Sequence, residues 1–263
     1  NDEFYMSLAI KKAWEFQILT YPNPAVGCVI LDASGRLLSV ASHKKAGFLH
    51  AEPSAILLAL CQKCEAFLSD FLREYHAALG VKFESAAELE NADLEPNFTY
   101  EYILQNHGDL LKGAKAYVTL EPCAHRGKTP PCAELLRRLK FAEVVIARSD
   151  ENVVASGGAH ILQSGGVAVK FEVLRQEADE LIEPFLSWQR WNFSFFKLAL
   201  SANGVAVGTA QSKIISNLAS RTHSHRLRSA AELLVIGGAT VRADLPRLDT
   251  RLIERGKNPN VMI

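Results

Sequence analysis

The sequence of 263 residues has few cysteines, no excess of charge of either sign and no long apolar run. No stretch approaches the roughly 20 consecutive apolar residues of a membrane-spanning helix, so we expect no contact with a membrane. The first residues lack the basic and apolar segments of a secretory signal, and we therefore expect a cytoplasmic protein. Five cysteines are an odd number, and a chain of this length can fold without disulfides. Reduced thiols, some of them holding a metal ion, are therefore expected.

The charges balance, with 29 Lys and Arg against 29 Asp and Glu. This balance argues against general binding of nucleic acid, which requires a basic surface. The share of hydrophobic residues, 48%, excludes a wholly disordered chain. The length is sufficient for two domains, each with a core of its own.

The apolar pattern predicts helices that alternate with strands through the first two thirds of the chain. Helices are expected at 2–20, 50–60, 132–140, 158–163 and 175–186. Strands are expected at 26–31, 36–41, 115–120, 143–147 and 167–171, the first two forming a hairpin. Such an alternation predicts a mostly parallel sheet covered by helices on both faces.

Residues 65–109 differ from their surroundings because they are acidic. They hold ten Asp and Glu against two basic residues, Arg73 and Lys82. Apolar side chains recur at helical spacing through 67–79, whereas residues 84–97 lack this pattern. We interpret 65–109 as a mostly helical acidic insertion with a looser middle. It is either a solvated elaboration or a contact with another domain or subunit.

The chain changes character at residues 187–192, which are the predicted domain joint. Beyond them we expect strands at 193–200 and 233–237, a helix at 216–228 and the beginning of a third strand at 260–263. This stretch is only about half the size of a typical domain. The sequence therefore predicts a first domain at 1–186 and an incomplete second domain at 187–263.

Three residues, His50, Cys123 and Cys132, have the character of zinc ligands. They form two groups, His50 with Glu52 and Cys123 with Cys132, and each group lies at or just before the expected start of a helix, where the helix dipole favours a thiolate. One histidine and two cysteines leave the fourth position of a tetrahedral zinc ion open, as in catalytic sites, and zinc there makes water acidic. Glu52 can accept a proton from that water and pass it to a leaving amine. The pattern His-x-Glu with Pro-Cys and a second Cys is typical of zinc deaminases of nucleobases.

Two other interpretations of these residues are possible. Cys123 and Cys132 could be buried apolar thiols beside an ordinary histidine. Alternatively the zinc site could be structural, but such sites normally have four protein ligands, and no fourth accompanies these three. Cys61 and Cys64 form a Cys-x-x-Cys without a matching pair, so we expect buried helical cysteines there.

The sequences around the three ligands form longer motifs. They are Tyr-Pro-Asn-Pro-Ala-Val-Gly at 21–27, His-Lys-Lys-Ala-Gly at 43–47 and Thr-Leu-Glu-Pro-Cys-Ala-His-Arg-Gly-Lys-Thr-Pro-Pro-Cys at 119–132. In these motifs, and in the eight residues between the two cysteines, the chain resembles the bifunctional riboflavin-biosynthesis deaminase/reductase family. The resemblance implies a three-layer α/β/α cytidine-deaminase-like domain, followed by part of a dihydrofolate-reductase-like α/β domain.

The resemblance also implies a substrate and a set of contacts. The reaction would be the hydrolytic deamination of 2,5-diamino-6-ribosylamino-4(3H)-pyrimidinone 5′-phosphate to 5-amino-6-(5-phosphoribosylamino)uracil, with Glu52 as the proton shuttle. Contacts with this phosphorylated pyrimidine would come from Asn23, His43, His125, Lys128 and Thr129. Independently of this resemblance, residues 110–148 carry eight Lys and Arg against three acidic residues. This excess of positive charge suits an anionic substrate.

The second half resembles the reductase of the same family more loosely, through residues 195–204 and 236–251. The resemblance implies reduction of the ribosyl group with NADPH. Contacts with the sugar phosphate would come from Lys197, Ser212, Ser216, Arg228, Asp244 and Arg251. Gly237, Gly238 and Thr240 would lie near the nucleotide. We also expect a homo-oligomer.

Two alternative functions are weighed against this one. The chain could be a deaminase of another nucleobase or of tRNA, although an enzyme acting on RNA would need a wide basic surface, and the insertion is acidic. It could also be a non-catalytic, zinc-stabilised module that scaffolds a partner. Such a module would keep the metal ion but release no ammonia.

Overall fold

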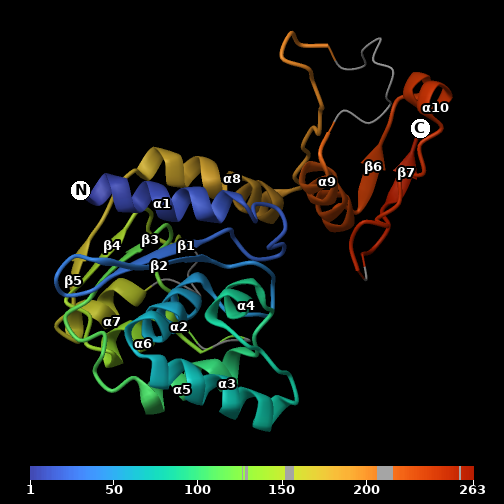
Figure 1. Ribbon diagram of the computed structural model, residues 1–263. Coiled ribbons are helices and arrows are strands. Elements are labelled where there is room, and N and C mark those ends of the chain that lie inside the picture. The colour runs from blue at the N-terminus through green and yellow to red at the C-terminus, as the bar shows by residue number, and fades with distance from the viewer. Residues whose placement is uncertain (126, 128–129, 152–156, 206–215, 255) are drawn as a thin grey trace. The chain divides into compact units, whose positions relative to one another are not determined.

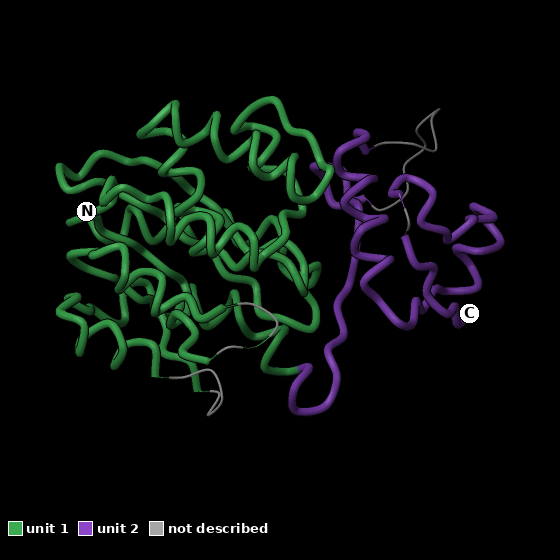
Figure 2. Tube along the Cα trace, turned by 90° about the horizontal axis from the view of Figure 1, so that it is seen from below, with its two compact units in different colours: residues 1–187 green, residues 188–263 purple. Residues whose placement is uncertain are grey.

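The computed structural model of the chain describes residues 1–125, 127, 130–151, 157–205, 216–254 and 256–263. The chain divides into two compact units, Asn1–Ser187 and Trp188–Ile263 (Figure 2). Among the residues described, each unit has a sheet of its own, of five strands in the first unit and two in the second.

The sheet of the first unit is mixed. Its strand order is β2 (Leu37–Ser42), β1 (Gly27–Leu31), β3 (Lys115–Val118), β4 (Glu143–Ile146) and β5 (Ala168–Lys170). β1 is antiparallel to both β2 and β3, whereas β3, β4 and β5 are parallel. The hairpin predicted for 26–31 and 36–41 is therefore confirmed, and β1 alone among the five strands runs opposite to the others. The antiparallel pairing of β1 with β3 is the one departure from the predicted mostly parallel sheet. The short turn at 32–35 forces β2 to pair with β1 as a hairpin, and β1 then joins β3 in the antiparallel sense.

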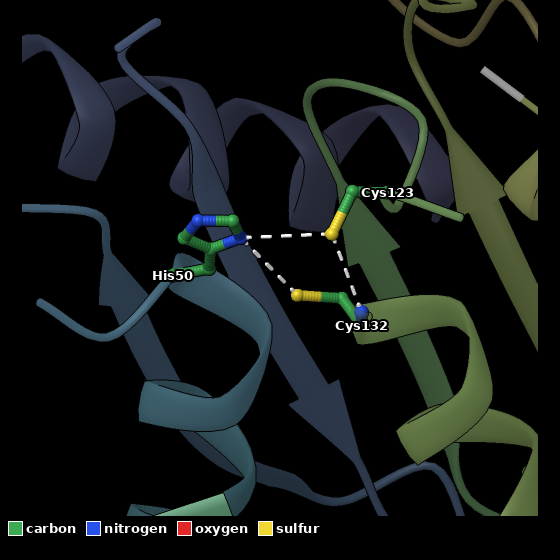
Figure 3. A group of neighbouring side chains, drawn as sticks. All are labelled: His50, Cys123 and Cys132. Carbon is green, nitrogen blue, oxygen red and sulfur yellow. Dashed lines mark hydrogen bonds between the residues drawn. The ribbon is translucent and has the colours of Figure 1, made fainter. Parts of the chain in front are cut away.

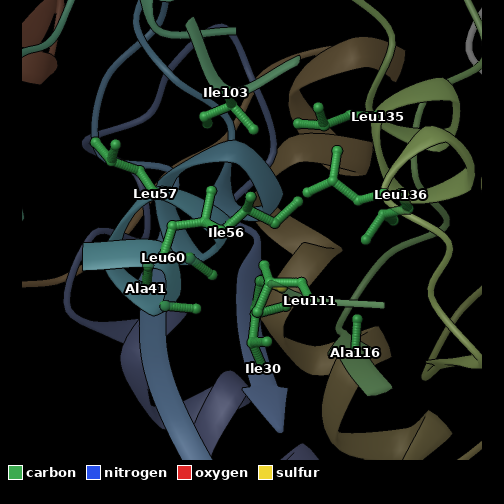
Figure 4. Close-up of a cluster of buried hydrophobic side chains, with 14 of the residues drawn as sticks. Ile30, Ala41, Ile56, Leu57, Leu60, Ile103, Leu111, Ala116, Leu135 and Leu136 are labelled. Carbon is green, nitrogen blue, oxygen red and sulfur yellow. The ribbon is translucent and has the colours of Figure 1, made fainter. Parts of the chain in front are cut away.

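Helices cover both faces of this sheet, so the predicted three-layer α/β/α arrangement is confirmed (Figure 1). One face is covered by α1 (Asp2–Trp14) and α8 (Arg175–Arg190), and the other by α2 (Ala51–Lys63), α6 (Cys132–Arg138) and α7 (Gly158–Ser164). The strands alternate accordingly: Val29 points to the core under α1, and Ile30 to the core under α2. Figure 4 shows Ile30, Ile56 and Leu136 from three elements of the larger core.

The first helix is shorter than its apolar spacing predicts. α1 ends at Trp14 rather than at residue 20, and residues 15–20 form turns. Within these turns the Gln17 side chain donates a hydrogen bond to the backbone oxygen of Leu181, and Thr20 donates to that of Asn23. A tertiary hydrogen bond to α8 and a local one to Asn23 therefore replace the last turns of the expected helix.

The acidic insertion is helical, as predicted, and belongs to the core of the first unit. It forms α3 (Glu65–Leu79), α4 (Ala86–Asn91) and α5 (Pro96–Asn106). Phe71 and Ile103 are wholly buried, and Phe71 packs edge-on against Tyr102. The interpretation as a solvated elaboration is therefore wrong, because the apolar faces of these helices are buried in the larger core.

The second unit consists of α9 (Leu218–Ala230), β6 (Leu233–Val235), α10 (Gly238–Asp244) and β7 (Asn260–Met262), with β6 parallel to β7. The strand predicted at 193–200 is wrong: these residues run without a partner strand among the residues described, and the Phe196 side chain is fully exposed. In the described parts of the chain, no helix has the length and apolar character to cross a membrane.

Candidate metal centre

Two helix starts bring the predicted ligands together. β2 ends at Ser42, a loop follows, and His50 is the N-cap of α2, with Pro53 in its first turn, where no N–H is needed. Cys132 is the first residue of α6, and Cys123 lies on the loop that follows β3. The ligand segments are thus anchored to three elements of the core.

The three ligand atoms converge on one point (Figure 3). His50 Nδ1 lies 3.7 Å from Cys123 Sγ and 3.4 Å from Cys132 Sγ. All three ligand atoms lie within 4.8 Å of one another. The backbone N–H of Cys132 also donates to Cys123 Sγ over 3.4 Å, and this bond orients the sulfur toward the cluster.

The donor set fits a zinc ion. Two thiols and one imidazole are soft or borderline ligands, and this combination with one open position occurs in catalytic zinc enzymes. Within the described residues, this is the group of His, Cys, Asp and Glu side chains whose ligand atoms are spaced for a metal ion, and it has three members. A closed structural site with four protein ligands would need a further side chain.

The surroundings of the two thiols favour a thiolate at this point. Hydrogen bonding from Cys132 and the neighbouring His50 together lower the pKa of the Cys123 thiol to about 4, against the opposing effect of burial. Cys132 is wholly buried, and burial raises its pKa. A bound cation would favour the ionisation of both thiols together, which is the effect of zinc on cysteine ligands.

Glu52 lies in the first turn of α2, beside the cluster. Its side chain is buried, with the residue 4% exposed. Burial and the neighbouring Cys123 raise the pKa of this carboxyl to about 7, against the opposing effects of His50 and of a hydrogen bond with Cys132. A carboxyl group with a pKa near neutrality can both accept and donate a proton, as general acid–base catalysis requires.

Asn23 and His43 form a hydrogen-bonded pair beside the metal centre. The His43 ring is buried and packs edge-on against the His50 ring, with centroids 5.3 Å apart. Burial and His50 lower the pKa of His43 to about 4, so the ring is neutral. Because the Leu49 carbonyl can only accept, His43 Nδ1 donates to it over 2.8 Å, and Nε2 accepts from Asn23 Nδ2 over 3.0 Å. Both nitrogens of the ring are thus occupied.

The other predicted substrate contacts lie on the loop between the cysteines. His125 is exposed on this loop, and Lys128 and Thr129 lie outside the described residues. The basic excess at 110–148 is largely neutralised by ion pairs with acids. The paired side chains are Lys115, Arg137, Arg138, Lys140 and Arg148.

Glu121 is a residue at the site that the sequence analysis missed. Its buried carboxylate accepts hydrogen bonds from the backbone N–H groups of Asp150 (3.2 Å), Gly157 (3.2 Å) and Ala159 (3.0 Å). It thereby joins the loop bearing Cys123, two residues on, to the loop after β4 and to the start of α7. An acid between a buried strand and Pro-Cys is the signal that could have indicated this role.

The residues predicted to bind the reductase substrate are only partly brought together. Arg228 on α9 donates to the backbone oxygen of Asp249, and Arg251 pairs with the carboxylate of the same residue. Lys197 and Asp244 are exposed on other segments, and Ser216 precedes α9. Ser212 lies outside the described residues. The residues predicted near the nucleotide, Gly237, Gly238 and Thr240, lie together at the N-terminal end of α10.

A known family shares this centre. The family model for the "Cytidine and deoxycytidylate deaminase zinc-binding region" matches residues 1–148, more than half of the chain. The chain belongs to this deaminase family. The match spans His50 and both cysteines, so the family and the geometry agree on zinc.

Relatives match over nearly the whole chain. The riboflavin biosynthesis protein RibD of Bacillus amyloliquefaciens is 33% identical over 98% of this chain and 57% of its own length. The RibD protein of Escherichia coli K12 is 32% identical over 97% of this chain and 57% of its own length. The chain therefore spans a little over half the length of these relatives.

Solved structures give the same result. The diaminohydroxyphosphoribosylaminopyrimidine deaminase/5-amino-6-(5-phosphoribosylamino)uracil reductase of Thermotoga maritima matches 99% of this chain and 62% of its own, with 29% identity and a TM-score of 0.60. The structure of RibD from Acinetobacter baumannii matches 97% of this chain and 59% of its own, with 30% identity and a TM-score of 0.56. The resemblance to the riboflavin-biosynthesis deaminase/reductase proteins, predicted from the motifs, is confirmed.

Proposed function

We propose that this deaminase-family chain acts in riboflavin biosynthesis and removes an amine from 2,5-diamino-6-ribosylamino-4(3H)-pyrimidinone 5′-phosphate. The observation that carries the proposal is the convergence of His50, Cys123 and Cys132 beside the buried Glu52. The name of the Thermotoga relative describes such a deaminase. The product would be 5-amino-6-(5-phosphoribosylamino)uracil, with release of ammonia.

In this proposal His50, Cys123 and Cys132 hold the zinc ion, and Glu52 moves the protons. Zinc, when bound, supplies the Lewis acid that turns water into a nucleophile at neutral pH. Glu52 accepts a proton from the attacking water and delivers protons to the ring nitrogen and to the departing amine. The bond from the ring carbon to the exocyclic nitrogen breaks, a carbonyl forms at that carbon, and ammonia leaves.

Asn23 contacts the pyrimidine in this proposal, and His43 orients Asn23. Since the Nε2 of His43 accepts from the Asn23 amide NH₂, the amide oxygen of Asn23 is directed elsewhere and can accept from an amino group of the substrate. His125, Lys128 and Thr129, on the loop between the cysteines, contact the rest of the substrate, with Lys128 as a cation for its phosphate.

The second unit belongs to a reductase in this proposal, and NADPH is its reductant. The names of the relatives support this assignment, as does the pairing of Arg228 and Arg251 around Asp249, which provides two cations near one loop. The sugar phosphate contacts Lys197, Ser212, Ser216, Arg228, Asp244 and Arg251, and the nucleotide lies near Gly237, Gly238 and Thr240. The assembly is a homo-oligomer without nucleic acid.

Replacement of Glu52 by Gln tests the deaminase reaction. The variant keeps the size of the side chain but cannot shuttle protons, so ammonia release should fall at least about 10³-fold while zinc content stays at one ion per chain. Turnover of the ribosylamino-pyrimidine phosphate is followed by its ultraviolet spectrum, with and without NADPH. Glu74→Gln, at an exposed position on α3, is the control and should retain the parental rate.

Parental turnover by Glu52→Gln would contradict the mechanism. A spectral change in the parent that requires NADPH would contradict a functional deaminase unit. Zinc binding without ammonia release from any pyrimidine would instead favour a non-catalytic module.

A further inference from the structure

The acidic insertion contacts two of the three segments that carry the metal ligands, those of His50 and Cys132. It lies between His50 and Cys123 in the sequence, and its helices α3 and α5 pack under α2 (Figure 1). Two of its parts reach the ligand segments: the side chain of Tyr100 on α5, and the turn at 90–93, which consists of the last two residues of α4 and the two that follow.

Tyr100 contacts the segment that carries Cys132. Its hydroxyl donates to the backbone oxygen of Pro131 over 3.0 Å. Pro131 is the N-cap of α6 and directly precedes Cys132. Tyr100 is only 4% exposed, so this bond is shielded from water and holds the first turn of α6 in one position.

The turn at 90–93 contacts the loop that leads to His50. The Lys44 ammonium donates to the backbone oxygen of Glu90, and Lys45 pairs with Asp93 at 3.3 Å. On either side of this turn, Leu89 and Leu94 are buried in the core. The turn is therefore anchored, and it can act as a fixed support for the loop.

This support is close to the ligand itself. Lys44 follows His43, whose Nδ1 donates to the backbone oxygen of Leu49, the residue before His50. A small cavity at the junction is lined by Lys44, Phe48 and Leu49 from the loop and by Glu90 and Asp93 from the turn. Loop and turn thus lie side by side along the approach to the metal ligand.

We propose that the insertion braces the metal centre, with Tyr100 positioning Cys132 and Lys44 positioning the loop that carries His50. The three proposed zinc ligands come from segments that are far apart in the sequence. Residues that contact metal ligands without touching the metal commonly influence the metal affinity. The insertion contacts two of these segments and thereby connects them. This inference rests on the proposed metal site, but it holds for any substrate.

Replacement of Tyr100 by Phe removes only the hydroxyl and therefore tests the brace in the full chain. We expect the dissociation constant for zinc, measured by competition with a chromophoric chelator, to rise about 5- to 10-fold. The absorption bands of the cobalt(II)-substituted protein should shift as well, because the ligand geometry changes.

The matched control is Tyr75→Phe. Tyr75 is equally buried, and its hydroxyl accepts from the backbone N–H of Glu95 over 2.8 Å, inside the insertion. This variant also loses one hydrogen bond between a buried tyrosine hydroxyl and a backbone group, here as acceptor rather than donor, without touching a ligand segment. Its zinc affinity should stay within twofold of the parent, even if its melting temperature falls as far as that of Tyr100→Phe.

A second variant, Lys44→Met, tests the other arm of the brace and should also weaken zinc binding several-fold. Its control is Lys82→Met, which breaks only an exposed pair with Glu84. Parental zinc affinity and cobalt spectrum in both Tyr100→Phe and Lys44→Met would overturn the brace, as would an equal loss of zinc in Tyr75→Phe. Failure of the parent to deaminate the pyrimidine would reject the proposed function alone, since the zinc titrations do not depend on it.

Discussion

The side chains around the metal centre are oriented by hydrogen bonds to main-chain groups of other segments. The N–H of Cys132 orients Cys123, the carbonyl of Leu49 orients His43, and three N–H groups converge on Glu121. Such bonds are stronger when the acceptor is charged and buried. The orientation of these side chains therefore depends on main-chain groups as well as on the side chains themselves.

Glu121→Gln should lower the free energy of unfolding by about 1–3 kcal/mol, measured by urea denaturation. One carboxylate oxygen becomes an NH₂ group, and whichever oxygen is replaced then faces a backbone N–H that loses its acceptor. Glu95→Gln provides the comparison, because Glu95 also accepts from backbone N–H groups, at the start of α5, but in a more exposed position. An equal or smaller loss in Glu121→Gln than in Glu95→Gln would contradict the role assigned to Glu121.

At the scale of elements, the sequence predicted the parts of the fold that local pattern determines. The strands 115–120 and 143–147 and the helix starting at Cys132 are present because apolar alternation and proline placement act within a few residues. His50, Cys123 and Cys132 could be identified because ligand chemistry depends on residue type and on order along the chain.

The predictions from sequence were wrong where contacts between residues far apart in the chain determine the local structure. Residues 15–20 keep helical spacing, yet contacts with α8 replace the helix. Residues 193–200 are apolar enough for a strand, but a strand needs a neighbour to satisfy its backbone groups. The direction of β3 relative to β1 is set by the path of the chain through α2 and the insertion, which no local signal encodes.

Helix α1 is attached to the sheet by its first residue. The Asp2 carboxylate binds Lys115 and Tyr117 of β3 and Lys170 of β5, at 3.0, 2.8 and 2.6 Å. The N-cap of α1 is Asn1, so the carboxylate of Asp2 is free of a capping role and binds the sheet. Hydrogen bonding from Lys170 holds the pKa of Asp2 well below its usual value of 3.8.

Asp2→Asn should therefore lower the free energy of unfolding by about 1 kcal/mol at pH 7. Because the folded pKa of Asp2 lies below the unfolded value, the stabilisation is present above about pH 4 and is lost as the pH falls further. Urea denaturation of parent and variant from pH 7 to pH 3 should show curves that converge toward acid. Curves that stay parallel throughout would contradict the assignment.

At the scale of the molecule, zinc links segments that the chain order separates. The ligands are distributed over the start of α2, the loop after β3 and the start of α6. An ion that binds the folded state stabilises it in proportion to the logarithm of its concentration over the dissociation constant. The metal is thus expected to contribute to the stability of the first unit as well as to its chemistry.

Removal of zinc by a chelator should lower the melting temperature by about 5–10 °C, measured by calorimetry. A hundredfold excess of free zinc over its dissociation constant corresponds to about 2.7 kcal/mol, and each kcal/mol shifts a protein of this size by about 2–4 °C. Added zinc should restore the transition in the parent but not in His50→Ala. An unchanged melting temperature after addition of the chelator would show that the metal contributes nothing to the stability of the fold.

The most direct test of the proposed centre is X-ray absorption at the zinc edge of the zinc-loaded protein. The proposed ligands predict two sulfur atoms at about 2.3 Å, one nitrogen at about 2.0–2.1 Å and one further light atom from solvent. A shell of four protein ligands, or one with fewer than two sulfur atoms, would contradict the proposed centre.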